Sequence, residues 1–287
     1  MTTGVEETLA ARWAWWHAER EEKLRAPHGW LSLTGLHWLA EQPGEFPGVP
    51  GQWRVEGGKA RVSASASAGL IVDGRVLDGT AEVLVPDDGA VTFAEFGGTE
   101  FGKVELGKTE SGETGIPAGR DDRAAIEVIV RSGRYGIRIR DPKAPLRLAF
   151  TGVPAFPVSG QWVLTARLDR YPTACEMVVD TAQNGLTGTE LAIGELRFRA
   201  AGLAQSLIAF ADGDDGITVV FSDVTSGVST APWRALWVAL TDEDSLQLDF
   251  NRAVNFPSAF SDYGTCPKPP AGNVLNIPVE AGERKPV

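Results

Sequence analysis

An alternation of apolar and polar residues with a period of two runs through most of this chain from Gln52 onward. In the segment 53–56 (WRVE), for example, the apolar Trp53 and Val55 alternate with the charged Arg54 and Glu56, which is typical of a strand with one face in a core. Gly-Gly and Asp-Gly pairs at 57–58, 73–74, 78–79 and 88–89 separate such segments. Because these pairs favour tight hairpin turns, the pattern predicts consecutive antiparallel hairpins.

One segment departs from this pattern. Residues 5–24 carry Leu9, Trp13 and Trp16 at helical spacing, with glutamates on the remaining surface and Pro27 beyond the end, as in an amphipathic helix. Elsewhere, 33 glycines and 18 prolines among 287 residues favour turns and short strands. We therefore predict a mainly β fold, either an antiparallel β-barrel or stacked sheets, with the N-terminal helix capping the body.

Composition along the chain suggests five segments of one compact unit. Residues 1–40 form the helix and a tryptophan-rich cap, since five of the nine tryptophans lie there. Residues 41–106 form a β-hairpin region, 107–122 a flexible loop, and 123–250 the main β body. Residues 251–287 carry aromatics among prolines and asparagines. Disordered tails lack such aromatics, so we predict an ordered meander there.

The charge balance excludes several classes of partner. There are 27 Lys and Arg against 38 Asp and Glu, a net charge of -11, and such a field repels nucleic acids and anionic lipid surfaces. No run approaches the roughly 18 apolar residues of a membrane span. Acidic residues follow Met1 where a signal peptide carries basic ones, so a cytoplasmic location is expected. Cys175 and Cys266 are too few for a disulfide framework.

Several blocks occur in order along nearly the whole chain. They are 29–39 (GWLSLTGLHWL), the pair 131–134 (RSGR) and 136–141 (GIRIRD), 221–227 (FSDVTSG), and a tail from 249–253 (DFNRA) through 266–270 (CPKPP) to 281–283 (AGE). Together they resemble the bacterial and archaeal domain of unknown function 1684 family. The resemblance supports the β fold and implies no particular reaction. Two positions depart from the family pattern, because Ser258 stands near a family cysteine and Ala231 follows Thr230 in place of a tyrosine. These departures argue against a paired-cysteine metal or redox role.

An arginine stripe marks the predicted strand at 134–141. Alternation places Arg134, Arg138 and Arg140 on one face and apolar residues on the other. If the apolar face packs in the core, the arginines are solvated or paired with acidic neighbours. If the stripe lines a barrel interior, the guanidinium forks suit a carboxylate or phosphate. The alternation leaves both interpretations open, and Arg131, Arg134 and Arg138 are the candidate ligand-binding residues of this hairpin.

Two residues are candidates for catalysis. Asp223 follows a predicted strand, where its carboxylate could act as a general base or ligand anchor at a barrel mouth. Alternatively, Asp223, Thr225 and Ser226 cap turn amides. Cys266 could act as a nucleophile if one of the N-terminal histidines met it, although an inert buried thiol is the interpretation we favour.

The sequence lacks the usual signatures of metal and cofactor sites. His17, His28 and His37 show no recognised ligand spacing, and no glycine-rich phosphate loop opens a helix. Neither a metal nor a cofactor is therefore expected.

We expect a cofactor-independent enzyme of the hydrolase, lyase or isomerase type, with Asp223 moving protons. It would act on a small polar or anionic metabolite in a barrel-like pocket whose rim includes Asn251, Arg252, Asn255 and Asn273. One alternative is a non-catalytic small-ligand-binding protein. Another is an interaction or scaffold protein whose tryptophan-rich N-terminus docks on a partner or on a second copy in a homodimer.

Overall fold

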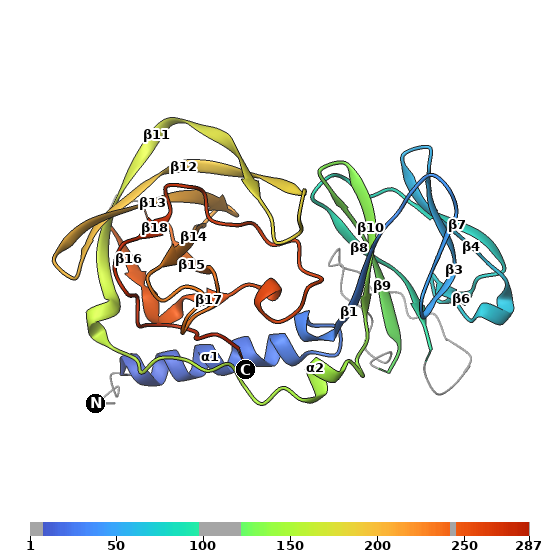
Figure 1. Cartoon of the computed structure of the whole chain (residues 1–287), viewed down its shortest axis with the longest axis horizontal. Coiled ribbons are helices and arrows are strands. Elements are labelled where there is room, and N and C mark those ends of the chain that lie inside the picture. The colour runs from blue at the N-terminus through green and yellow to red at the C-terminus, as the bar shows by residue number, and fades with distance from the viewer. Residues whose placement is uncertain (1–7, 98–121, 242–244, 287) are drawn as a thin grey trace, which may run out of the picture. The chain divides into compact units, whose positions relative to one another are not determined.

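The computed structural model describes residues 8–97, 122–241 and 245–286 (Figure 1). Apart from Asp122, the predicted loop at 107–122 lies outside the described residues. Contacts divide the chain into two compact units: unit 1 comprises Met1–Glu22 with Thr151–Val287, and unit 2 comprises Lys23–Phe150. The boundary after Phe150 falls inside the segment 123–250, which was predicted to form one β body. The five predicted segments stay a prediction.

Unit 2 consists of two antiparallel sheets. The larger sheet has the order β1 (Leu33–Trp38), β10 (Arg134–Arg140), β9 (Ala124–Arg131), β8 (Ala90–Phe96), β5 (Ile71–Val72) and β6 (Arg75–Val76). The smaller has the order β2 (Gly44–Phe46), β3 (Val49–Glu56), β4 (Lys59–Ala64) and β7 (Gly79–Val83). Trp53 of β3 shares one apolar core with Ile126 of β9 and Ile137 of β10, so the two sheets pack face to face. A single-turn helix, α2 (Pro145–Leu148), follows β10.

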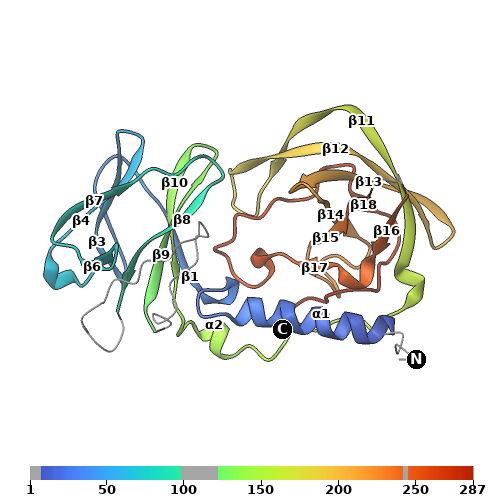
Figure 2. The same ribbon diagram turned by 180° about the vertical axis from the view of Figure 1, so that it is seen from behind.

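Unit 1 is built on one long sheet. Its order is β16 (Ser245–Asp249), β11 (Val163–Asp180), β12 (Thr187–Ala200), β13 (Leu203–Asp212), β14 (Gly216–Asp223), β15 (Arg234–Ala239) and β17 (Val254–Asn255). These strands pair antiparallel, whereas β18 (Val274–Leu275) pairs parallel with β14. Figures 1 and 2 show β11, β12 and β13 arching over β14, β15 and β16. Apolar side chains of both groups meet in one core, which includes Leu196, Phe221 and Phe250.

Helix α1 (Leu9–Arg25) runs along unit 1 through residues 9–22 (Figures 1 and 2). The Trp13 indole Nε1 donates to the carbonyl of Asn251 at 2.6 Å. The Arg20 guanidinium donates to the buried carboxylate of Glu283, with Nε 2.5 Å from Oε1. Both ends of the chain therefore contribute to unit 1. No described helix is long and apolar enough to cross a membrane.

The predicted mainly β, antiparallel fold with one amphipathic N-terminal helix is confirmed. Of the two predicted architectures, stacked sheets fit and a closed barrel does not, because within the described residues the terminal strands β16 and β17 do not pair with each other. The physical reason lies in the short turn Phe250–Arg252 between them. This turn takes the chain from β16 into β17, which pairs only with β15, so the ladder stays open.

Candidate functional site

Asp223, the predicted general base, lies buried at the end of β14, and both of its carboxylate oxygens have donors. Oδ1 accepts from the backbone N of Thr225 at 2.8 Å, its Oγ1 at 2.6 Å and the backbone N of Val279 at 3.2 Å. Oδ2 accepts from Nη2 of Arg234 at 2.9 Å. These contacts anchor the turn after β14 and the C-terminal segment. A catalytic role for Asp223 stays a prediction.

The other half of this ion pair, Arg234 on β15, is equally buried. Its guanidinium donates to the carbonyls of Val279, Ala281 and Glu283 at 3.0, 2.5 and 3.2 Å. Desolvation lowers the pKa of Arg234 from its ordinary value, and the charge of Asp223 opposes this shift. One buried arginine thus binds the carbonyls of three alternate residues of the C-terminal segment, while its ion pair with Asp223 joins β15 to β14.

Cys266 is buried, with 8% of its surface exposed. Its carbonyl accepts from the backbone N of Ala182, in the connection between β11 and β12.

The other cysteine and the histidine of α1 lie elsewhere in unit 1. Cys175, on β11, is exposed. His17 stacks on Trp13 with ring centroids 4.5 Å apart. Among the described residues, no group of three or more His, Cys, Asp or Glu side chains is arranged to hold a metal ion.

Asn273 completes the sheet where two strands separate. The ladder of β13 and β14 ends at the pair Phe210–Thr218, and continuing the register would bring Ile208 opposite Val220. The Asn273 amide lies between these two residues instead. It accepts from the N of Ile208 at 2.7 Å and donates to the carbonyls of Ile208 and Val220 at 3.0 and 2.8 Å. This side chain therefore replaces a backbone pairing.

The remaining predicted rim residues also contact the protein itself. Asn251 exchanges hydrogen bonds with the backbone of Ser159. The backbone N of Asn255 donates to Glu283, and its side chain donates to the carbonyl of Arg284. The guanidinium of Arg252 lies 5.4 Å from the centre of the Trp16 ring. Their predicted ligand-binding role stays a prediction.

The predicted arginine stripe belongs to unit 2, whereas Asp223 and the rim residues belong to unit 1. The apolar face of β10 packs in the core of unit 2, and Arg138 and Arg140 both contact Glu127, at 3.4 and 3.2 Å. Desolvation lowers the pKa of the buried Arg138 guanidinium, although Glu127 opposes this. On the same hairpin, Arg131 donates to the carbonyl of Gly89 at 2.7 Å.

Trp30 adds an aromatic partner to this cluster, with Arg140 4.8 Å and Arg138 5.6 Å from the ring centre. Arg134 lies 4.6 Å from the Trp38 ring centre. The sequence left two interpretations of the stripe open. The contacts of Arg138 and Arg140 with Glu127 agree with the one in which the arginines pair with an acidic neighbour.

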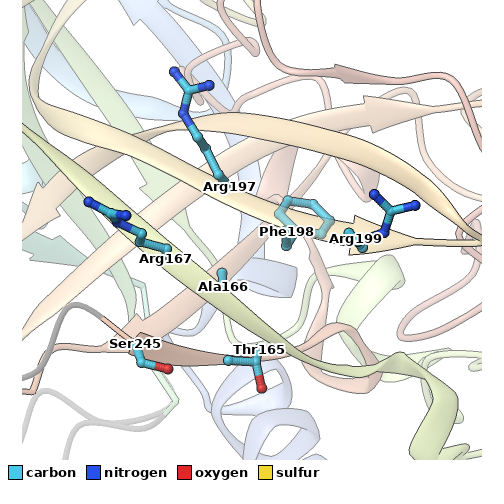
Figure 3. A pocket seen from close by; sticks show the side chains of 7 residues that line it. All are labelled: Thr165, Ala166, Arg167, Arg197, Phe198, Arg199 and Ser245. Carbon is cyan, nitrogen blue, oxygen red and sulfur yellow. The ribbon is translucent and has the colours of Figure 1, made fainter.

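A different group of arginines lines an open hollow of about 510 Å³ on the sheet of unit 1 (Figure 3). We call it the arginine pocket, and it is lined by Thr165, Ala166, Arg167, Arg197, Phe198, Arg199 and Ser245. Arg167 of β11 lies directly opposite Arg197 of β12 in the ladder, and also opposite Ser245 of β16. In Figure 3 the Thr165 and Ser245 side chains are both drawn below the three arginines, and the Arg199 side chain lies further along β12 than that of Arg197.

Asp169 bridges the two opposed arginines. Its Oδ1 lies 3.0 Å from Nε of Arg167, and its Oδ2 lies 2.6 Å from Nε of Arg197. Glu195 accepts from Nη2 of Arg197 at 3.2 Å. Arg199 donates to the carbonyl of Gly202 at 2.5 Å, and within the described residues it makes no ion pair. The pocket therefore presents guanidinium groups whose charge is only partly balanced.

This pocket was not predicted from the sequence. The spacing Arg197-Phe-Arg199 within a predicted strand was the available signal, since it places two arginines on one face. Which strand lies beside them depends on the register, and the register brings Arg167 to Arg197 from 30 residues away.

Comparison with known proteins places the C-terminal half of the chain in a family. Residues 148–284 match the model described as Protein of unknown function (DUF1684). This part of the chain belongs to that family. The DUF1684 part contains the arginine pocket, Asp223 and Cys266, whereas the blocks at 29–39 and 131–141 lie outside the matched residues.

Among solved structures, the solution structure of an uncharacterised protein from Haloarcula marismortui is 31% identical to this chain. The similarity covers 48% of this chain and 78% of that one, with a TM-score of 0.41. No curated protein matches the chain.

Proposed function

We propose that the DUF1684 part binds a small polyanion in the arginine pocket, as a non-catalytic ligand-binding protein. The observation that carries this proposal is the gathering of three guanidinium groups from two adjacent strands around one hollow. It occurs in a chain whose net charge is -11. Arginine binds oxyanions such as phosphates and carboxylates through two parallel hydrogen bonds. The proposal includes the cytoplasmic location expected from the sequence.

The strand register gives the first supporting argument. Like charges directly opposite each other in an antiparallel ladder are destabilising, and Arg167 faces Arg197 in this way. Asp169 offsets part of this repulsion, whereas Arg199, two residues along the same face, has no carboxylate partner in the described part of the chain. A local arrangement that opposes stability is expected at a functional site rather than at an ordinary sheet surface.

The donors left available give the second argument. Asp169 contacts both arginines through Nε, so the two Nη atoms of Arg167 and Nη1 of Arg197 remain for an incoming oxyanion. Thr165 and Ser245 add hydroxyl groups that make no hydrogen bond among the described residues. Arg167 and Arg197 are 76% and 61% exposed, so a ligand can reach them. This donor set suits a ligand with at least two negative charges, such as a phosphate ester or a polycarboxylate.

The lining residues favour binding over the catalytic hypothesis. They are arginines, hydroxyl residues, Ala166 and Phe198. The carboxylates beside the pocket, Asp169 and Glu195, already accept from arginines. A general base works best when it is placed to receive a substrate proton, and the arrangement described here offers donors to a ligand instead.

Titration calorimetry with pyrophosphate and citrate tests the proposal, with Arg199→Ala and Arg199→Lys as variants. Losing one charge-assisted contact of about 1 to 1.4 kcal/mol should weaken binding roughly five- to tenfold. Lysine should restore only part of the affinity, since it lacks the planar fork. Arg75→Ala is the matched control, because Arg75 is an exposed arginine on β6 in unit 2.

The affinity of the arginine pocket for pyrophosphate or citrate should also fall as salt is added. Its arginine charges are exposed, and dissolved ions screen such charges over about 8 Å at physiological ionic strength. The proposal fails if neither probe binds at millimolar concentration. It fails equally if Arg199→Ala and Arg75→Ala bind as wild type does.

A further inference from the structure

The two opposed arginines of the arginine pocket belong to a longer row of residues that crosses four strands. The ladder places Ser245 of β16 opposite Arg167 of β11, Arg167 opposite Arg197 of β12, and Arg197 opposite Ser206 of β13. Figure 3 shows Arg167 between Ser245 and Arg197. All four residues are exposed, and directly opposed residues share one face of a sheet. We call these four residues the cross-strand row.

The charges beside the cross-strand row limit how an elongated anion can lie on it. Two residues away along β11 and β12, Asp169 and Glu195 lie opposite each other, so the charge reverses its sign in that direction. In the other direction, β12 ends one residue beyond Arg199. The positive surface along the strands is therefore short, whereas the row across the strands carries no acidic residue. Because carboxylates repel a nearby anion, a long anion should lie across the strands.

The length and the donors of the row indicate the class of anion. Adjacent strands lie about 4.8 Å apart, so the outer residues of the row are about 14 Å from each other. Guanidinium groups donate to oxyanions, and serine hydroxyls can donate as well. A matching ligand carries acceptor oxygens along its whole length, as a chain of linked phosphoryl groups does. An acidic peptide also carries backbone N–H donors, which the guanidinium groups cannot accept.

We propose that the arginine pocket binds a linear phosphate chain of three or more phosphoryl groups, which lies along the cross-strand row. This inference rests on the proposed function, because it names the class of polyanion that the pocket binds. Arg167 and Arg197 bind the central phosphoryl groups, and Ser245 and Ser206 bind the outer ones. The small serine side chains at both ends leave space above the sheet for the chain to continue.

Titration calorimetry of the full chain with orthophosphate, pyrophosphate and tripolyphosphate tests the dependence on chain length. Each added phosphoryl group adds about one charge-assisted contact, so the affinity should rise roughly fivefold or more per group. If pyrophosphate binds and tripolyphosphate binds no more tightly, this inference is overturned while the proposed function stands. If none of these probes binds and citrate does not bind either, both fail.

Two variants with the same change in net charge test the direction of the chain. Ser206→Lys adds a cation at the β13 end of the row, whereas Glu195→Gln removes an anion beside Arg197 along β12. Ser206→Lys should raise the ratio of tripolyphosphate affinity to orthophosphate affinity roughly fivefold, and Glu195→Gln should raise it less. The opposite order would place the chain along the strands and overturn the inference.

Ser67→Lys is the matched control for Ser206→Lys. Ser67 is an exposed serine of the short helix η2 (Ala66–Ala68) in unit 2, and this variant should bind all three phosphates as wild type does. An equal gain in Ser67→Lys would show that net charge alone sets the affinity and would overturn the inference. Circular dichroism of each variant checks that the fold is intact.

Competition with a hexaglutamate peptide separates a phosphate chain from an acidic peptide. Displacing half of the bound tripolyphosphate should need a peptide concentration at least about tenfold higher than that of competing free tripolyphosphate. A peptide that competes equally well would assign the row to acidic peptides and overturn the inference.

Discussion

The buried pair of Asp223 and Arg234 gives the sharpest stability prediction. Arg234→Met keeps much of the side-chain volume but removes four hydrogen bonds, one to Asp223 and three to carbonyls of the C-terminal segment. The side chains of both partners are almost fully buried, at 1% and 0% exposure. Removing one partner of such a pair leaves a buried charge without its counter-charge, which costs about 3–5 kcal/mol. We expect a loss of about 4 kcal/mol in the free energy of unfolding of unit 1.

Urea unfolding followed by circular dichroism measures this loss, and hydrogen exchange at the amides of β14 locates it. The double variant with Asp223→Asn removes the uncompensated charge, and the asparagine Oδ1 can still accept from Thr225. It should therefore be more stable than Arg234→Met alone. A loss below about 1 kcal/mol for Arg234→Met, or a double variant as unstable as the sum of both single changes, would refute the reasoning.

Four further predictions concern the N-terminal helix, the two cysteines and His37. Deleting residues 1–26 should lower the melting temperature markedly, because it removes the Trp13 contact with the segment after β16; an unchanged melt would contradict this. Cys266→Ala should cost about 1 kcal/mol. A thiol reagent at neutral pH should label Cys175 in the native protein, and both cysteines only after unfolding. Burial lowers the pKa of His37, so its contribution to stability should be present above the unfolded pKa of about 6.5 and decline as the pH falls through the lower folded pKa. An NMR titration midpoint of His37 at or above 6.5 would contradict this prediction.

Local pattern was sufficient for the fold class. The period-two segments and the glycine turns indicated antiparallel strands, and the left-handed backbone at Asp73 and Gly74, between the paired strands β5 and β6, shows why an Asp-Gly dipeptide suits a hairpin. The helical spacing of Leu9, Trp13 and Trp16 indicated the helix. Each of these signals is contained within about 20 residues, so no tertiary information was needed.

The candidate site was less predictable because its contacts join distant parts of the chain. Nothing near Asp223 indicated that Arg234 and the amide of Val279, 56 residues away, would engage its carboxylate. Asn273 likewise resembled a turn residue, although it fills a gap between β13 and β14. The arginine pocket needed the register of β11 against β12, which a periodic pattern does not specify.

The bond between Arg20 and Glu283 spans 263 residues of sequence, and this has a consequence for synthesis on the ribosome. The whole of unit 2, Lys23–Phe150, is synthesised between the two segments of unit 1, Met1–Glu22 and Thr151–Val287. At about 5–20 residues per second, the interval between Arg20 and Glu283 is roughly 13–50 seconds. During that interval the C-terminal residues that α1 packs against, such as Asn251 and Glu283, have not yet been synthesised. The chain order therefore allows unit 2 to fold while unit 1 is still incomplete.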